Sequence, residues 1–174
     1  MADLRDVLLV DGYNMIGAWG ELAKLSEISL QEARDRLLER LANYQAFSGR
    51  RVIAVFDAYR VPGLGKVYEQ GKVELYFTKE KETADEAIER FVGQLKHRRR
   101  QIYVATSDMT EQHVIFGQGA LRLSARELLI EVQISEKEIK ERLREQQQDS
   151  NRNTLDGKLN AQQRIMFEKW RRGE

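Results

Sequence analysis

Four aspartates are the residues of this sequence whose types and spacing best suit chemistry. Asp11, Asp57 and Asp108 follow short apolar runs that predict strands, and Asp85 stands in the first turn of a predicted helix. Two unit charges about 4 Å apart repel by ~4 kcal/mol at an effective dielectric of about 20. A divalent cation removes that repulsion, and oxygen ligands alone suit Mg²⁺ or Mn²⁺. Such an ion activates water and stabilises charge on a phosphoryl oxygen, which is the chemistry of phosphodiester hydrolysis.

Three of these aspartates also have a purely structural interpretation. Asp11 precedes a glycine and fits a turn, Asp85 complements the positive end of a helix dipole, and Asp108 fits a helix N-cap. Asn14 could orient a carboxylate or the attacking water, or it could cap a helix. A structural role is a reasonable explanation for any one of these aspartates. It is a less expected explanation for all of them together.

The elements that must position these side chains alternate between strands and helices. Apolar runs predict buried strands at residues 7–10, 52–56, 73–77, 102–105 and 121–123. Capping-box patterns predict helices that begin at Ser29, Thr83, Ser124 and Ser135. Buried strands that alternate with helices indicate an α/β fold: a mostly parallel sheet of about five strands with helices on both faces. The carboxyl ends of such strands meet at one edge of the sheet, which is where the aspartates fall.

The length and composition favour one compact domain with a short extension. The 174 residues include no cysteine, which excludes disulfides and thiolate chemistry, and the net charge is +1. We expect a soluble, cytoplasmic protein with no membrane partner, since no apolar run reaches the ~18 residues of a membrane span. Residues 1–146 are predicted to form the domain, and residues 147–174 a polar linker and a basic C-terminal helix. Residues 58–71 are predicted to form a long loop.

Four short motifs carry a family resemblance. In chain order they are Asp11-Gly12-Tyr13-Asn14, Val55-Phe56-Asp57-Ala58, Glu82-Thr83-Ala84-Asp85 and Thr106-Ser107-Asp108. Together they resemble the NYN branch of the PIN-like nucleases, and within it the bacterial YacP-type proteins. The resemblance runs from about residue 8 to about residue 129 and does not cover the tail after residue 146.

The resemblance implies a PIN-like (Rossmann-like) three-layer fold and a metal-dependent endoribonuclease. It implies that Asp11, Asp85 and Asp108 bind the metal ion, with Asn14 and Asp57 close by. Proteins similar to this one act on messenger RNA in the context of the ribosome. The resemblance therefore implies RNA as the substrate and the ribosome as a partner.

Basic and aromatic side chains near the aspartates are candidates for contacts with RNA, which needs positive charge around an acidic site. The basic candidates are Arg60, Lys66, Lys79, Lys81 and Arg126. Tyr59 and Tyr68 could stack on unpaired bases. Every one of these residues also fits an ordinary solvated surface. Lys79 and Lys81 are favoured because they directly precede the helix that carries Asp85.

Other functions are compatible with parts of the pattern. A PIN-like module that binds RNA or a ribosomal surface without cutting it is the main alternative, although several carboxylates would repel a bound phosphate. A metal-free ribonuclease mechanism would use a pair of catalytic histidines. His113 follows Asp108 by five residues and could approach the site, and His97 is the other histidine of the sequence. The sequence does not fit a phosphorylated receiver domain, because that family has paired acidic residues after the first strand and only Asp11 is present here. Neither an Asp-x-Asp phosphohydrolase motif nor a P-loop is present.

Overall fold

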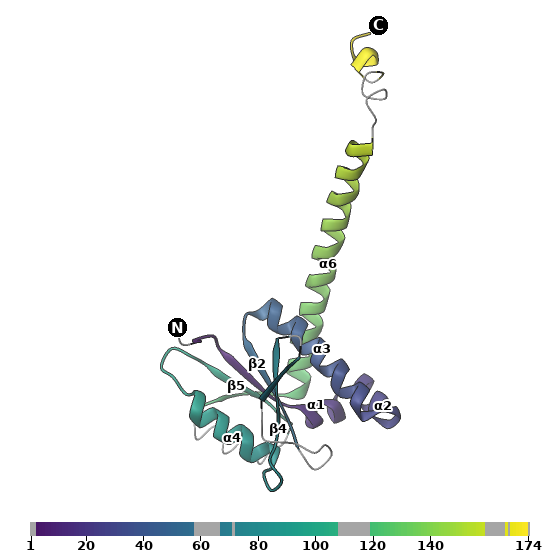
Figure 1. Cartoon of the computed structure of the whole chain (residues 1–174). Coiled ribbons are helices and arrows are strands. Elements are labelled where there is room, and N and C mark those ends of the chain that lie inside the picture. The colour runs from purple at the N-terminus through teal and green to yellow at the C-terminus, as the bar shows by residue number, and fades with distance from the viewer. Residues whose placement is uncertain are drawn as a thin grey trace. The chain divides into compact units, whose positions relative to one another are not determined.

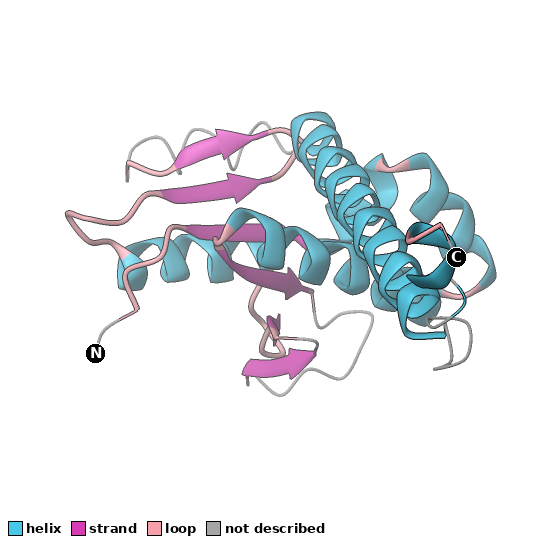
Figure 2. Cartoon of the chain, turned by 90° about the horizontal axis from the view of Figure 1, so that it is seen from above, coloured by secondary structure: helices cyan, strands magenta, loops and turns pink. Residues whose placement is uncertain are grey.

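The computed structural model describes residues 3–57, 67–70, 72–107, 119–158, 166 and 168–173. Within this part of the chain, a six-stranded sheet has the order β3-β4-β2-β1-β5-β6 (Figures 1 and 2). The strands are β1 (Val7–Asp11), β2 (Arg51–Phe56), β3 (Val67–Gln70), β4 (Val73–Phe77), β5 (Ile102–Ala105) and β6 (Leu121–Leu123). Neighbouring strands pair in parallel, except that β3 is antiparallel to β4.

Helices cover both faces of the sheet, so the fold has the three layers that the sequence predicts. They are α1 (Gly12–Ala18), α2 (Gly20–Ile28), α3 (Leu30–Ser48), α4 (Ala84–Leu95) and α6 (Ala125–Lys158). Alternate residues of each strand face opposite layers. In β1, Leu8 and Val10 pack in one core with α1, α2, α3 and the first turns of α6, whereas Val7 and Leu9 pack in the other core with α4.

Local sequence accounts well for where several elements begin and end. The five predicted strands are present to within one residue at either end. Ser29 caps α3 by accepting a hydrogen bond from the Glu32 amide at 3.2 Å, and Gly49 ends the helix with a φ of 74°. Thr83 caps α4 in the same way.

Two parts of the fold differ from the sequence prediction. Val67–Gln70, placed in the long loop, forms β3 because its backbone pairs with β4. Residues 12–28, for which no element was predicted, form α1 and α2. Three glycines lower the helix propensity there, so burial decides instead. Trp19, which joins the two helices, is 1% exposed and donates its indole N–H to the Ala125 carbonyl at 2.8 Å.

Two further predictions, both about the region of α6, differ from the structure. Ser135 does not begin a helix, because its buried hydroxyl donates to the Val132 carbonyl at 2.7 Å within α6. Residues 147–153 are helical where a linker was predicted, as the continuation of a helix that is rich in strong helix formers (Lys, Glu, Arg, Leu and Gln) over residues 140–148.

The chain divides into two compact units, Met1–Glu136 and Lys137–Glu174. In the second unit, the described side chains from residue 137 to residue 152 are exposed apart from Ile139, which is half-buried, and Met166 and Trp170 are 71% and 83% exposed. No helix in the described ranges is both long enough and apolar enough to cross a membrane.

The junction of β1 and α1 needs a glycine. A Cβ atom at Gly12 would lie 2.2 Å from the Phe56 ring, which is fully buried and packs against Tyr13 and Phe77 at centroid distances of 5.1 and 5.7 Å. Because the ring is held on both sides, it has no room to move away. Gly17, in the same helix, has no atom within 4 Å of an added Cβ.

We expect Gly12→Ala to lower the free energy of unfolding by about 1–3 kcal/mol, because overpacking forces core side chains to shift. The matched variant Gly17→Ala should leave stability unchanged or raise it by about 0.5–1 kcal/mol, since alanine favours the helix. Urea denaturation followed by circular dichroism measures both. Equal stabilities for the two variants would contradict the packing argument.

Candidate active site

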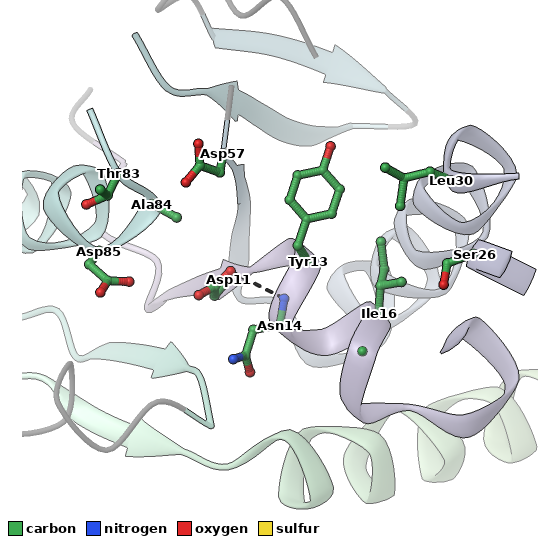
Figure 3. A pocket seen from close by; sticks show the side chains of 11 residues that line it. Asp11, Tyr13, Asn14, Ile16, Ser26, Leu30, Asp57, Thr83, Ala84 and Asp85 are labelled. Carbon is green, nitrogen blue, oxygen red and sulfur yellow. Dashed lines mark hydrogen bonds between the residues drawn. The ribbon is translucent and has the colours of Figure 1, made fainter. Parts of the chain in front are cut away.

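Three aspartates from separate segments line one cavity of about 600 Å³ at the carboxyl edge of the sheet (Figure 3). Asp11 ends β1, Asp57 follows β2, and Asp85 is the second residue of α4. Asp11 and Asp57 are half-buried, and Asp85 is exposed. The structure therefore brings together three of the four aspartates singled out by the sequence. Asp108 lies outside the described residues.

Asp11 has a structural role as well as a place in the cavity. It is the N-cap of α1, and its carboxylate accepts a hydrogen bond from the Asn14 amide at 3.4 Å. This contact uses one of the two carboxylate oxygens, so the capping role and metal binding are compatible. The strand ends and the helix begins without a connecting loop, which holds the Asp11 backbone in both elements.

Asp85 is positioned by the turn that leads into α4. Glu82, just before the Thr83 cap, accepts a hydrogen bond from the Tyr76 hydroxyl at 2.7 Å and lies 3.2 Å from the Arg90 guanidinium. Arg90 also donates to the Tyr76 hydroxyl at 2.7 Å. Burial raises the pKa of Tyr76, which keeps its phenol protonated as the donor to Glu82. These contacts tie the start of α4 to β4.

Asn14 connects α1 to the end of β5. Its side-chain oxygen accepts hydrogen bonds from the Ser107 amide at 2.9 Å and from the Ser107 hydroxyl at 2.7 Å. The helix cap is Asp11, so the alternative prediction that Asn14 caps a helix is wrong. Asn14 instead fixes the residue that directly precedes Asp108 in the sequence.

Among the residues that the structure describes, no group of three or more His, Cys, Asp or Glu side chains is arranged to hold a metal ion. The predicted ligand set Asp11, Asp85 and Asp108 includes a residue outside those ranges. The donors in the cavity are oxygen atoms, which is the chemistry that Mg²⁺ and Mn²⁺ require. The donor types fit such an ion, and the coordination itself stays a prediction.

The predicted RNA-binding residues fall into two groups. Lys79, Lys81 and Arg126 are exposed, and none of them is among the residues that line the cavity. Lys79 and Lys81 belong to the turn before α4, next to Asp85 in the sequence. Arg60, Lys66, Tyr59 and His113 lie outside the described residues, and only the backbone of Tyr68 is described, in β3.

The sequence interpretation missed the other wall of the cavity. It is lined by Tyr13, Ile16, Gly17, Ser26 and Leu30. Only Tyr13 could have been found from the sequence, because it belongs to the motif that contains Asp11 and Asn14. The remaining residues come from α1, α2 and the start of α3, and α1 and α2 were not predicted.

We expect the link between Asn14 and Ser107 to appear as a coupling in stability. Ser107→Ala should lower the free energy of unfolding by about 0.5–1 kcal/mol in the wild-type background, because a hydrogen bond is lost. In an Asn14→Ala background the same change should have almost no effect, since the acceptor is gone. Urea denaturation of the four proteins gives the coupling, and Ser107→Thr, which keeps the hydroxyl, serves as the control. Additive effects would contradict the proposed link.

The chain matches a known family and proteins with sequences and structures similar to its own. The family model described as "YacP-like NYN domain" matches residues 8–172. The match extends through α6 and the tail, beyond the range that the motifs suggested. The chain is 52% identical over 171 residues to "Uncharacterized protein YacP" of Bacillus subtilis (strain 168), which covers 97% of this chain and 98% of that protein.

Solved structures agree with this result. The crystal structure of Rae1 (YacP) from Bacillus subtilis matches with a TM-score of 0.76 and 52% identity, over 97% of this chain and 95% of that one. A mutant of the same protein matches with a TM-score of 0.74 and 53% identity, over 82% and 84% of the two chains. The fold is therefore the α/β fold of these proteins, and the relationship indicates a nuclease-like module related to RNA. The chain belongs to the YacP-like NYN domain family.

Proposed function

We propose that the chain is a metal-dependent endoribonuclease that hydrolyses phosphodiester bonds in single-stranded RNA, with messenger RNA on the ribosome as its expected substrate. One observation carries the proposal: Asp11, Asp57 and Asp85 come from three segments and line one cavity. Membership of an NYN family supports the same function. The ribosome as a partner follows from the resemblance of the sequence motifs.

Asp11, Asp85 and Asp108 would hold Mg²⁺ or Mn²⁺, with Asp57 beside them. A bound ion of this kind lowers the pKa of water and stabilises charge on the phosphoryl oxygen. The carboxylates need such a partner, because a phosphodiester that enters the cavity brings further negative charge to a site that already contains three aspartates. A module that only bound RNA would gain nothing from this arrangement.

The protein side chains then have separate tasks. Asp57 is half-buried in the cavity and can accept a proton from the attacking water as a general base. Asn14 holds Ser107 and with it the start of the segment that contains Asp108. The bonds from Tyr76 and Arg90 to Glu82 hold the turn before Asp85. Water attacks phosphorus while the bond from phosphorus to the 3′ oxygen breaks, and the leaving 3′ oxygen takes up a proton. The products would be a 5′-phosphate and a 3′-hydroxyl.

We expect cleavage to require both the metal ion and the aspartates. Wild-type protein should cut single-stranded RNA, or messenger RNA on translating ribosomes, in Mg²⁺ or Mn²⁺ and not in EDTA. Asp11→Asn and Asp85→Asn should each reduce the rate by about 100-fold or more, because each removes a charge worth several kcal/mol to the transition state. Gel analysis of end-labelled RNA measures the rate and the end groups.

Asp35→Asn is the matched control, because Asp35 is exposed on α3 and does not line the cavity. Its rate should equal that of the wild type. If the wild type binds RNA or ribosomes but cuts neither substrate in any metal, the enzyme proposal fails and a binding module takes its place. A difference between the two substrates shows whether the ribosome is required.

We expect Lys79 and Lys81 to contact RNA phosphates on the way into the cavity. Lys79→Ala and Lys81→Ala should each weaken RNA binding, and each should reduce the slope of log K against log salt by about 0.7, the value for one phosphate contact on a single strand. Fluorescence anisotropy in EDTA measures binding without cleavage. Lys24→Ala, which removes an exposed lysine from α2, should change neither quantity. An unchanged slope in both Lys79→Ala and Lys81→Ala would show that these lysines do not contact RNA phosphates.

A further inference from the structure

The cavity has a second wall whose chemistry differs from that of the carboxylates. In Figure 3, Asp57, Thr83 and Asp85 lie together, and Ile16, Ser26 and Leu30 lie apart from them, with Tyr13 between Asp57 and Leu30. Ile16 is 3% exposed, and Tyr13 and Leu30 are half-buried. Hydrolysis of a phosphodiester requires the acidic wall only, so the second wall is available for another part of the substrate.

Tyr13 is held in place before any ligand arrives. Its ring packs edge-to-face on Phe56 with centroids 5.1 Å apart and an interplanar angle of 69°. Its hydroxyl accepts a hydrogen bond from the Arg34 guanidinium at 3.1 Å, and Arg34 lies one helical turn after Leu30 in α3. A ring fixed at both ends loses little entropy when a flat ligand stacks on it.

We propose that the wall formed by Tyr13, Ile16, Gly17 and Leu30 binds one nucleobase of the RNA, beside the phosphate at the aspartates. The inference rests on the proposed function and adds a base-binding site to it. A cavity of about 600 Å³ has the size of a small-molecule site and is larger than a phosphate needs. An unpaired base is flat and apolar on its faces, which matches an aromatic ring flanked by aliphatic side chains. Because both walls belong to one cavity, a nucleotide can reach both at once.

Gly17 allows the wall to be filled without disturbing the fold. It lines the cavity, it is exposed, and an added Cβ meets no atom within 4 Å, so a side chain introduced by Gly17→Leu begins in open space. Leu30→Ala trims the wall from the opposite helix. The matched controls are Gly93→Leu, at an equally open helical glycine in α4, and Ile28→Ala, at an apolar residue that is 83% exposed and does not line the cavity.

The test compares probes that differ only in the base. Uridine 5′-monophosphate, adenosine 5′-monophosphate and ribose 5-phosphate are titrated into each protein in Mg²⁺ by isothermal calorimetry. We expect the nucleotides to bind wild type about 5-fold to 150-fold more tightly than the sugar phosphate, the range for one stacked base. Gly17→Leu and Leu30→Ala should bring this ratio towards one without weakening ribose 5-phosphate, and the controls should keep the wild-type ratio.

Equal binding of the three probes to wild type, or no binding of the nucleotides, overturns the inference. So does a wild-type ratio in both Gly17→Leu and Leu30→Ala. The outcome is independent of catalysis. If the base preference is present and altered by these variants but no RNA is cut, the nuclease proposal falls and the base site stands. If RNA is cut and the base preference is absent, the base site falls and the nuclease proposal stands.

Discussion

The junction between β1 and α1 is the constraint on which the site depends. Asp11 is the last residue of the strand and the cap of the helix, so its backbone serves two regular elements. The next residue has to be glycine, because the Phe56 ring of β2 occupies the space where a Cβ would lie. The same ring supports Tyr13 one residue further on. One contact, between the start of α1 and Phe56 of β2, therefore helps to place both a carboxylate and an aromatic ring in the cavity.

Polar contacts add to the apolar packing that holds the other segments of the acidic wall. Asn14 reaches across to Ser107 at the end of β5, and Glu82 connects the turn before α4 to Tyr76 of β4. Such bonds are directional, so they fix the segments from which the carboxylates project. Repulsion among the carboxylates acts against this arrangement, and the scaffold must resist it when no cation is bound. The rigid junction and the polar links together make that resistance possible.

The wall opposite the aspartates shows how far sequence interpretation could go. Apolar runs and capping boxes predicted five strands and the starts of α3, α4 and α6, because those signals depend on neighbouring residues alone. They did not predict α1 or α2, which contain three glycines and are stabilised by the burial of Trp19 and Leu22. Ser135 has the sequence pattern of a cap and still lies inside a helix, since its hydroxyl finds a carbonyl one turn earlier. Local patterns are ambiguous wherever tertiary contacts provide an alternative partner.

The sequence by itself determined the α/β class, the family and the grouping of Asp11, Asp57 and Asp85 at one edge of the sheet. The position of the aspartates could be predicted because parallel strands end at a common edge, whatever the details of their packing. Only the tertiary structure decided that Asp11, Asp57 and Asp85 share a cavity with Tyr13, Ile16 and Leu30. It also decided that Asn14 binds Ser107 rather than capping a helix. Those outcomes depend on contacts between residues far apart in the chain, such as Asn14 and Ser107, and no local pattern specifies them.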